Sequence, residues 1–216
     1  MQKIIVRYRG LQDYSECWQQ MQTFNATRNK NTPDEIWLLE HPAVFTLGLN
    51  GKPEHILDLH NIPLVNTDRG GQITYHAPGQ LIAYLLFDLR RNKQGVRQLV
   101  TQMEQAVINL LQQYQIKSSA KKEAPGVYVN GEKIAALGLR VKRGGSYHGL
   151  SLNIDMDLKP FSYINPCGYK GLKVTSLQQL AVMYNSEQVK ERLLTCLFEQ
   201  FNIDPSQIEF IHESEA

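Results

Sequence analysis

The segment GVYVNGEKIAALGLRV, residues 126–141, contains two largely apolar runs separated by Asn130-Gly131. An Asn-Gly pair between two such runs is the strongest short-range signal of a β-hairpin, because both residues tolerate the positive φ of a tight turn. The segment YHGLSLNIDM (147–156) follows with the alternation typical of a third strand. This stretch therefore predicts three consecutive antiparallel strands, and it decides the fold class.

The rest of the chain adds strands and helices without strict alternation. LIAYLLFDL (81–89) is nearly all apolar, which is typical of a strand covered on both faces. IWLLEHPAVFTLG (36–48) predicts two strands interrupted at Pro42, because proline cannot donate to a sheet. Helices are expected over 14–24, 96–114, 176–183 and 187–201. We expect an α+β fold, a single domain over residues 1–216 with a mixed, largely antiparallel sheet flanked by helices.

The composition excludes several classes of protein. The chain of 216 residues is 42% hydrophobic and 20% charged, and its net charge of +2 is too small to indicate a nucleic-acid partner. Three cysteines without paired spacing argue against a disulfide framework and favour a reducing compartment. Arg7 and Arg9 interrupt the region where a signal peptide needs apolar residues, and the longest apolar run (81–87) is far shorter than the ~20 residues that cross a bilayer. We expect a cytoplasmic protein without nucleic-acid or membrane partners.

NPCGYKG (165–171) places Cys167 on a Pro-Gly loop next to Lys170. Because the thiolate is the reactive form of cysteine and nearby cations favour it, Lys133, Lys170 and Lys173 are candidates to activate this thiol. A loop cysteine without a chemical role is the plain alternative.

Histidines offer a second way to activate the thiol, and the other cysteines offer a contrast. A Cys–His pair would use His76 or His148 as the base. Cys17 and Cys196 lie on the apolar faces of predicted helices, where we expect buried thiols that pack like small apolar groups.

RGGQITYHAPGQ (69–80) has the features of a ligand-binding segment. Gly70 and Gly71 allow the backbone to approach a ligand closely. Thr74 and His76 occupy alternate strand positions and therefore face the same way. The alternative is a hairpin turn followed by a hydrogen-bonded core histidine.

Lys133 directly follows the Asn-Gly turn, so the alternative to a functional role is an exposed lysine at a strand edge. The chain has no HExxH, CxxC or GxxxxGK[ST] pattern, and we expect no metal and no cofactor. Basic doublets occur at Arg90-Arg91, Lys121-Lys122 and Lys142-Arg143, either as a patch for an acidic partner or as solvated surface.

Taken together, these segments resemble the octanoyltransferase family, the lipoyl(octanoyl) transferases of protein lipoylation. RGGQITYHAPGQ resembles the family's RGGxxTxHxPGQ segment, and GEKIAALGLRV resembles its lysine-bearing strand. YHGLSLNI and the PCG…VTSL segment resemble the parts that complete the site. The resemblance covers most of the chain, shows no departure at these positions, and implies a fold like the catalytic domain of biotin and lipoate protein ligases.

The resemblance also implies a reaction and its residues. An octanoyl group would pass from octanoyl-acyl carrier protein, through a thioester on Cys167, to a lysine of lipoyl domains of 2-oxoacid dehydrogenases and of the glycine cleavage H protein. Lys133 would depress the pKa of Cys167 and act as base and acid in turn, with His148 as a supporting residue. The acyl group would lie along Arg69, Gly70, Gly71, Gln72, Ile73, Thr74, Tyr75, His76, Ala136, Leu137, Gly138, Gly149, Leu150 and Ser151. A monomer is expected.

General chemistry agrees with this expectation. Exchange between thioesters is nearly balanced in free energy and transfer to an amine runs downhill, so no ATP is needed. Glycines at 70, 71, 138 and 149 would make room for an alkyl chain, and their N–H groups could stabilise an oxyanion.

Two other functions fit the same sequence. An ATP-dependent lipoate or biotin ligase on the same fold would need no nucleophilic cysteine, so a dispensable Cys167 would favour it. A non-enzymatic protein that binds acyl carrier protein through the basic doublets would form no covalent adduct.

Overall fold

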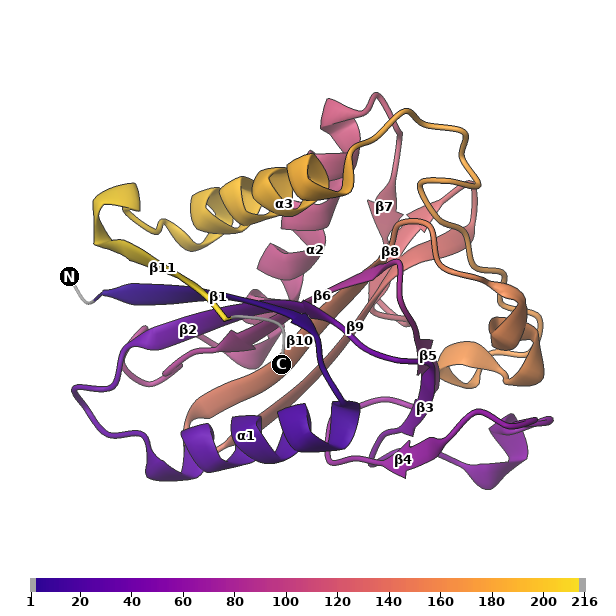
Figure 1. Cartoon of the computed structure of the whole chain (residues 1–216), viewed down its shortest axis with the longest axis horizontal. Helices are drawn as coiled ribbons and strands as arrows, with labels where there is room; N and C mark the ends of the chain where they lie inside the picture. The colour runs from indigo at the N-terminus through magenta and orange to yellow at the C-terminus, as the bar shows by residue number, and fades with distance from the viewer. Residues whose placement is uncertain (1–2, 214–216) are drawn as a thin grey trace.

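The computed structural model describes residues 3–213, and the side chain of Cys167 lies outside the described part. Its main feature is an eight-stranded mixed sheet (Figure 1). In order across the sheet the strands are β11 (Ile208–His212), β1 (Ile4–Leu11), β2 (Asp34–Glu40), β6 (Gln80–Leu86), β10 (Gly145–Asn153), β9 (Glu132–Lys142), β8 (Gly126–Val129) and β7 (Ser119–Ala120). β1 is parallel to both its neighbours, whereas the other neighbouring pairs are antiparallel. The predicted mixed, largely antiparallel sheet is confirmed.

The antiparallel meander over 126–153 forms as the sequence predicts. Asn130 and Gly131 have φ of 51° and 86°, the positive values that a two-residue hairpin turn requires. The register between β8 and β9 shifts next to Lys133, since Val127 pairs with Ala135 whereas Tyr128 pairs with Lys133. Such a bulge re-aims side chains and is common beside active sites.

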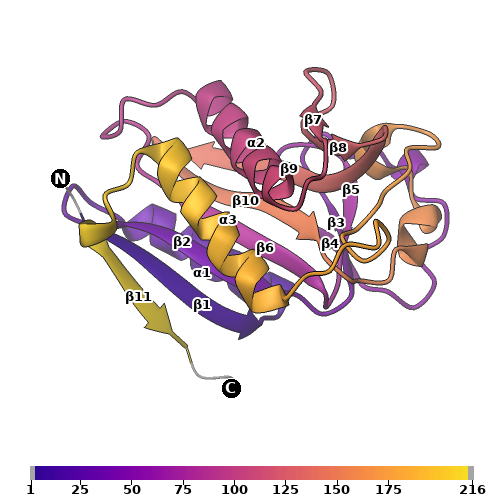
Figure 2. The ribbon, with the colours of Figure 1, turned by 90° about the horizontal axis from the view of Figure 1, so that it is seen from above.

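Helices cover both faces of the large sheet (Figures 1 and 2). α1 (Tyr14–Thr27) lies on one face, and α2 (Val96–Gln113) and α3 (Ser186–Phe201) lie together on the other. β6 is buried along its whole length because alternate side chains enter the two cores: Leu81, Ala83 and Leu85 pack with α2 and α3, and Ile82, Tyr84 and Leu86 pack with α1. The prediction of a strand covered on both faces is confirmed.

Cys17 and Cys196 lie inside these two cores, as expected. Burial raises the pKa of Cys17 to about 12 and that of Cys196 to about 11. Both thiols are therefore protonated and unreactive at neutral pH.

A second, three-stranded sheet lies beside the β9 and β8 end of the large one (Figure 1). It consists of β4 (Leu64–Asn66), β3 (Val44–Leu47) and β5 (Ile73–His76). As predicted, the strands β2 and β3 are separate on either side of Pro42. Short 3-10 turns lie at Pro53–His55, Lys159–Tyr163, Pro166–Gly168 and Pro205–Gln207.

The predicted helix over 176–183 is wrong. The backbone N–H groups of Leu177 and Gln178 donate to the carbonyls of Asn153 and Ile154 at the end of β10, and only one turn follows, with the N–H of Leu180 donating to the carbonyl of Ser176. Ala181 has a φ of 54°, which ends the single turn that does form. The edge strand β11 and its neighbour β1, by contrast, were not predicted. Within residues 3–213, no helix is long and apolar enough to cross a membrane.

Candidate active site

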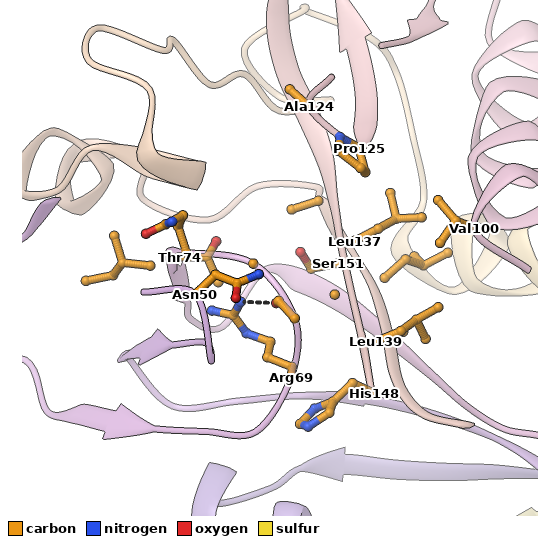
Figure 3. Close-up of a pocket in the computed structure, with 18 of the residues that line it drawn as sticks. Asn50, Arg69, Thr74, Val100, Ala124, Pro125, Leu137, Leu139, His148 and Ser151 are labelled. Carbon is orange, nitrogen blue, oxygen red and sulfur yellow. Dashed lines mark hydrogen bonds between the residues drawn. The ribbon is translucent and has the colours of Figure 1, made fainter. Parts of the chain in front are cut away.

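A cavity of about 410 Å³ lies between the β9–β10 part of the large sheet, the β5 side of the small sheet and α2. In Figure 3, Arg69 and Thr74 face it from one side, across from the apolar side chains of Val100, Leu137 and Leu139. Its volume falls in the range of about 300–1,000 Å³ that is typical of small-molecule sites. The wall is apolar on the side formed by α2 and β9, and polar on the side formed by the small sheet.

The three segments that the sequence singled out meet at this cavity. Its wall includes Arg69, Gly70, Gly71, Gln72, Ile73, Thr74, His76, Ala136, Leu137, Gly138, His148, Gly149, Leu150 and Ser151. Tyr75 is the exception, because strand alternation turns its ring into the apolar cluster of the small sheet, against Phe45 and Phe161. The expectation that Tyr75 lines the acyl path is therefore corrected.

The glycines serve close packing as well as the cavity. A Cβ at Gly149 would lie 2.1 Å from the carbonyl oxygen of Ala83, and one at Gly138 would lie 3.0 Å from Cδ of Arg69. The N–H of Gly70 donates to the carbonyl of Leu139 at 2.9 Å. Gly70 is thus engaged in joining the two sheets, which corrects the expectation that its N–H could stabilise an oxyanion.

Arg69 is fixed to the small sheet. Its Nη2 donates to the carbonyl oxygen of Thr46 at 2.6 Å and to the Thr46 hydroxyl at 2.8 Å. Its Nη1 donates to the carbonyl of Gly70 at 3.0 Å. These bonds place a buried guanidinium in the cavity wall in a single orientation.

His148 lies in the wall of the cavity with an unusual backbone. Its φ of 61° is rare for a non-glycine residue and is typical of functional sites. Its Nε2 lies 3.3 Å from the Asp68 carboxylate, which also accepts hydrogen bonds from Tyr147, Trp18 and Gln22. Burial alone would raise the pKa of Asp68, but these hydrogen bonds outweigh it and lower that pKa well below its usual value. Asp68 is an anion that holds His148 in place.

The histidines around the cavity are held neutral. Burial lowers the pKa of His148, takes that of His76 well below its ordinary value, and lowers the pKa of His41 to about 4. His76 Nδ1 lies 2.7 Å from the Gln80 side-chain oxygen, and His41 Nε2 lies 2.7 Å from the Tyr84 hydroxyl. His76 is therefore a buried, hydrogen-bonded histidine, as the alternative interpretation of the sequence proposed, and it also lines the cavity.

Lys133 is buried, with only 3% of its surface exposed, which excludes the exposed strand-edge alternative. Its Nζ donates to the carbonyl oxygen of Pro125 at 3.0 Å and lies 5.3 Å from the centre of the Tyr128 ring. A small cavity of about 10 Å³ is lined by Lys133 and Pro166. It shares Thr74, Ala136 and Ser151 with the wall of the large cavity, so the lysine lies at one end of the site.

The backbone of Cys167 lies in the 3-10 turn Pro166–Gly168, which packs beside β5. The N–H of Asn165 donates to the carbonyl of His55 at 2.8 Å, and a Cβ at Gly168 would lie 3.2 Å from Nε2 of His55. His55 is a neighbour of the cysteine turn that the sequence reasoning did not identify. The predicted contact between Cys167 and Lys133 involves the side chain of Cys167, which lies outside the described part of the structure.

Other wall residues were also missed. They are Tyr14, Asn50, Ile82, Tyr84, Val96, Val100, Glu123, Ala124, Pro125, Leu139 and Tyr169. Leu139 had a local signal, since it is two residues beyond Leu137 on the same strand. The others come from α1, α2, β6 and loops that only the fold brings together.

The basic doublets occupy different environments. Arg91 donates to the buried Asp34 carboxylate at 2.5 Å, so it is part of the structure. Lys142 and Arg143 lie at the β9–β10 turn. Lys121 and Lys122 immediately precede the cavity wall at Glu123, and Lys121 Nζ lies 4.1 Å from the centre of the Tyr128 ring. Among residues 3–213, no cluster of three His, Cys, Asp or Glu could hold a metal ion.

Comparison with known proteins agrees with this geometry. Residues 13–198 match the model of the lipoyl protein ligase A/B catalytic domain. The chain is 58% identical over 189 residues to the octanoyltransferase of Laribacter hongkongensis, which covers 88% of this chain and 91% of the relative. The chain belongs to the octanoyltransferase family. It is an enzyme that transfers octanoyl groups in protein lipoylation, as the motifs predicted.

Solved structures show the same fold as this octanoyltransferase. A bipartite lipoate protein ligase from Thermoplasma acidophilum aligns with a TM-score of 0.76 at 14% identity, over 100% of this chain and 88% of that one. A biotin protein ligase from Aquifex aeolicus aligns with a TM-score of 0.55 at 12% identity, over 94% and 70%. The predicted likeness to the lipoate and biotin ligase catalytic domain is confirmed for the fold.

Proposed function

We propose that the octanoyltransferase takes its octanoyl group from octanoyl-acyl carrier protein and transfers it to a lysine of lipoyl domains and of the glycine cleavage H protein. The acyl group would be held on Cys167 as a thioester between the two half-reactions. The observation that carries the proposal is Lys133: it is buried at one end of the cavity and lines the same small cavity as Pro166, the residue before the cysteine.

In the first half-reaction, the Cys167 thiolate attacks the carbonyl carbon of the donor thioester. A carbon–sulfur bond to Cys167 forms, the bond to the carrier's thiol breaks, and the leaving thiolate takes a proton. In the second, the acceptor amine attacks the new thioester, an amide forms and the Cys167 thiolate leaves. Lys133 takes the proton of the Cys167 thiol and passes it to the leaving thiolate of the carrier. In the second half-reaction it receives the proton that the acceptor amine releases and returns it to Cys167.

The cavity supports an alkyl substrate. Val100, Leu137 and Leu139 offer an apolar surface for a chain, and the nearby histidines are neutral. The acyl path would follow Arg69–Thr74, His76, Ala136–Gly138 and Gly149–Ser151. We propose that the enzyme acts as a monomer in the cytoplasm.

Intact-protein mass spectrometry tests the thioester directly. Incubation with octanoyl-acyl carrier protein, without acceptor, should load one octanoyl group that neutral hydroxylamine removes, since hydroxylamine cleaves thioesters and leaves amides. Cys167→Ala should not load. Cys17→Ala and Cys196→Ala are matched controls that should load normally, because both thiols are buried in the cores. Loading of Cys167→Ala would contradict the proposal.

The ligase alternative makes a different prediction. Transfer to a lipoyl domain should proceed without ATP and magnesium. An absolute requirement for ATP, with free octanoate as the preferred donor, would instead favour an acyl-adenylate mechanism and a dispensable Cys167.

A further inference from the structure

Four consecutive residues, Glu123–Gly126, form a strap at one end of the cavity, and each has a backbone group that is hydrogen-bonded to a side chain outside the strap. The strap's bonds are Tyr169 hydroxyl to Glu123 carbonyl (2.9 Å), Tyr128 hydroxyl to Ala124 carbonyl (2.8 Å), Lys133 Nζ to Pro125 carbonyl (3.0 Å), and Gly126 N–H to Glu104 Oε1 (2.9 Å). Tyr169 follows the turn that holds Cys167, Tyr128 lies on β8, and Lys133 lies on β9. Only Glu104 comes from α2.

Gly126 lies directly against the lysine side chain. Its φ of 145° is strained for other residues, and a Cβ there would lie 2.9 Å from Cε and 3.1 Å from Nζ of Lys133. The position of this one residue therefore sets the space available to the amine. The neighbouring Pro125 carbonyl then receives the amine's hydrogen bond.

Lys133 is close enough to influence the pKa of Glu104. Burial raises the pKa of Glu104, while the Gly126 hydrogen bond and the charge of Lys133 oppose that rise. The side chain is half-buried beneath the strap and does not line the cavity, so its influence on a substrate would be indirect.

We propose that Glu104 is a positioning residue for acyl transfer: its Oε1 fixes Gly126, and through it the Pro125 carbonyl that orients the Lys133 amine. The inference rests on the role of Lys133 given under the proposed function. Without the carboxylate oxygen of Glu104, the N–H of Gly126 must find another hydrogen-bond acceptor, and the strap then moves relative to the Lys133 amine. Groups that orient the ligands of a metal in this indirect way typically contribute about 10–100-fold to affinity or activity, and we expect the same scale for a group that orients a catalytic lysine.

The test compares side chains at position 104 that differ in whether they offer an oxygen to the N–H of Gly126. Glu104→Gln keeps an oxygen at the same reach, Glu104→Leu removes it, and Glu104→Asp retracts it by one methylene. Glu132→Gln is the matched control: it removes an acid next to Lys133 in sequence, but one whose side chain points to the other side of the strand. Each variant is assayed for kcat, for KM toward the octanoyl donor, and for the pH profile of Cys167 alkylation.

We expect Glu104→Leu to lose about 10–100-fold in kcat with an unchanged donor KM, and its alkylation profile to move to higher pH. Glu104→Asp should change both in the same direction, which keeps the test valid if the leucine variant does not fold. Glu104→Gln and Glu132→Gln should behave like the parent enzyme. Normal kcat in Glu104→Leu and Glu104→Asp, or an equal loss in Glu104→Gln, would overturn the assignment.

A double variant separates this inference from the proposed function. Adding Glu104→Leu to Lys133→Met should cost nothing beyond Lys133→Met alone, because Glu104 acts through the lysine. Independent, multiplying losses would overturn the inference and leave the role of Lys133 intact. A fully active Lys133→Met with an unchanged alkylation profile would instead overturn the proposed role of the lysine itself.

Discussion

Lys133 and Val174 form a parallel β-bridge. The N–H of Lys133 donates to the carbonyl of Lys173, and the N–H of Thr175 donates to the carbonyl of Lys133, each at 2.9 Å. The segment that follows the cysteine turn is thus added to the edge of the lysine-bearing strand. The two candidate catalytic residues are 34 positions apart in sequence, and this bridge determines how far the cysteine turn can move from the lysine.

The same bridge explains how a charged side chain is held inside the protein. Its two backbone bonds hold the main chain of Lys133, and the bulge beside it turns the side chain inward toward Pro125. A buried ammonium is costly unless its donors are engaged, so its position is well determined.

Replacing Lys133 tests the chemistry of the amine. Lys133→Met keeps a similar length but removes the charge and the proton, so transfer should fall by about 10²–10⁴-fold and Cys167 alkylation should move to higher pH. Lys133→Arg should rescue poorly, because guanidinium keeps the charge but cannot release its proton. Lys170→Met, at an exposed lysine three residues after the cysteine, is the control and should remain active. An active Lys133→Met would point to a histidine base.

Alanine at two glycines should separate stability from binding. Gly149→Ala places a methyl group 2.1 Å from the carbonyl oxygen of Ala83, a backbone atom that cannot move alone. We therefore expect the free energy of unfolding to fall by about 1–3 kcal/mol, the range typical of an overpacked core. Gly138→Ala meets the side chain of Arg69 at 3.0 Å, which can move. It should fold normally and raise the donor KM instead. Urea unfolding and steady-state kinetics measure the two effects, and equal stability of both variants would contradict this assignment.

Charge reversal should matter at only one of the basic doublets. Lys121 and Lys122 adjoin the strap, whereas Lys142 lies three residues along β9 beyond the wall residue Leu139, about 10 Å at 3.3 Å per residue. Lys121→Glu with Lys122→Glu should raise KM for an acidic protein substrate and flatten its salt dependence. Lys142→Glu with Arg143→Glu is the matched control. A larger effect at 142–143 would show that protein substrates dock elsewhere.

Stability should fall as the medium is acidified toward pH 4. The pKa of His41 is lowered from 6.5 to about 4 in the folded protein, so the unfolded chain binds its proton first. This contribution, of order 3 kcal/mol at most, is fully present above pH 6.5 and is lost as pH falls toward 4, about 1.4 kcal/mol for each pH step. His76 and His148 act in the same direction.

His41→Gln isolates this contribution, because glutamine does not titrate. The free energy of unfolding, measured in urea at pH 7, 6 and 5, should decline less steeply for the variant than for the parent enzyme. Parallel pH profiles for the two proteins would show that His41 does not contribute.

Local sequence determined those parts of the fold that depend on neighbours along the chain. The Asn130-Gly131 turn follows from the backbone freedom of two adjacent residues. Helical spacing of apolar residues placed Cys17 and Cys196 in the cores, and alternation aimed Thr74 and His76 at the cavity. Four ordered motifs were enough to indicate the octanoyltransferase family. The single domain over 1–216 and the role of Cys167 stay predictions.

Tertiary structure decided what depends on partners distant in sequence. The segment 176–183 has helical spacing, but hydrogen bonds tie its start to residues 153 and 154, and Ala181, with a φ of 54°, ends it after one turn. Lys133 follows an exposed turn, yet a bulge and the bridge to Val174 bury it. In the sequence, Glu104 is an ordinary acidic residue of a predicted helix, and only the folded structure brings its carboxylate to the N–H of Gly126. In each case a hydrogen bond or buried contact across the fold outweighs a local preference of at most about 1 kcal/mol, and such a preference is all that neighbouring residues can encode.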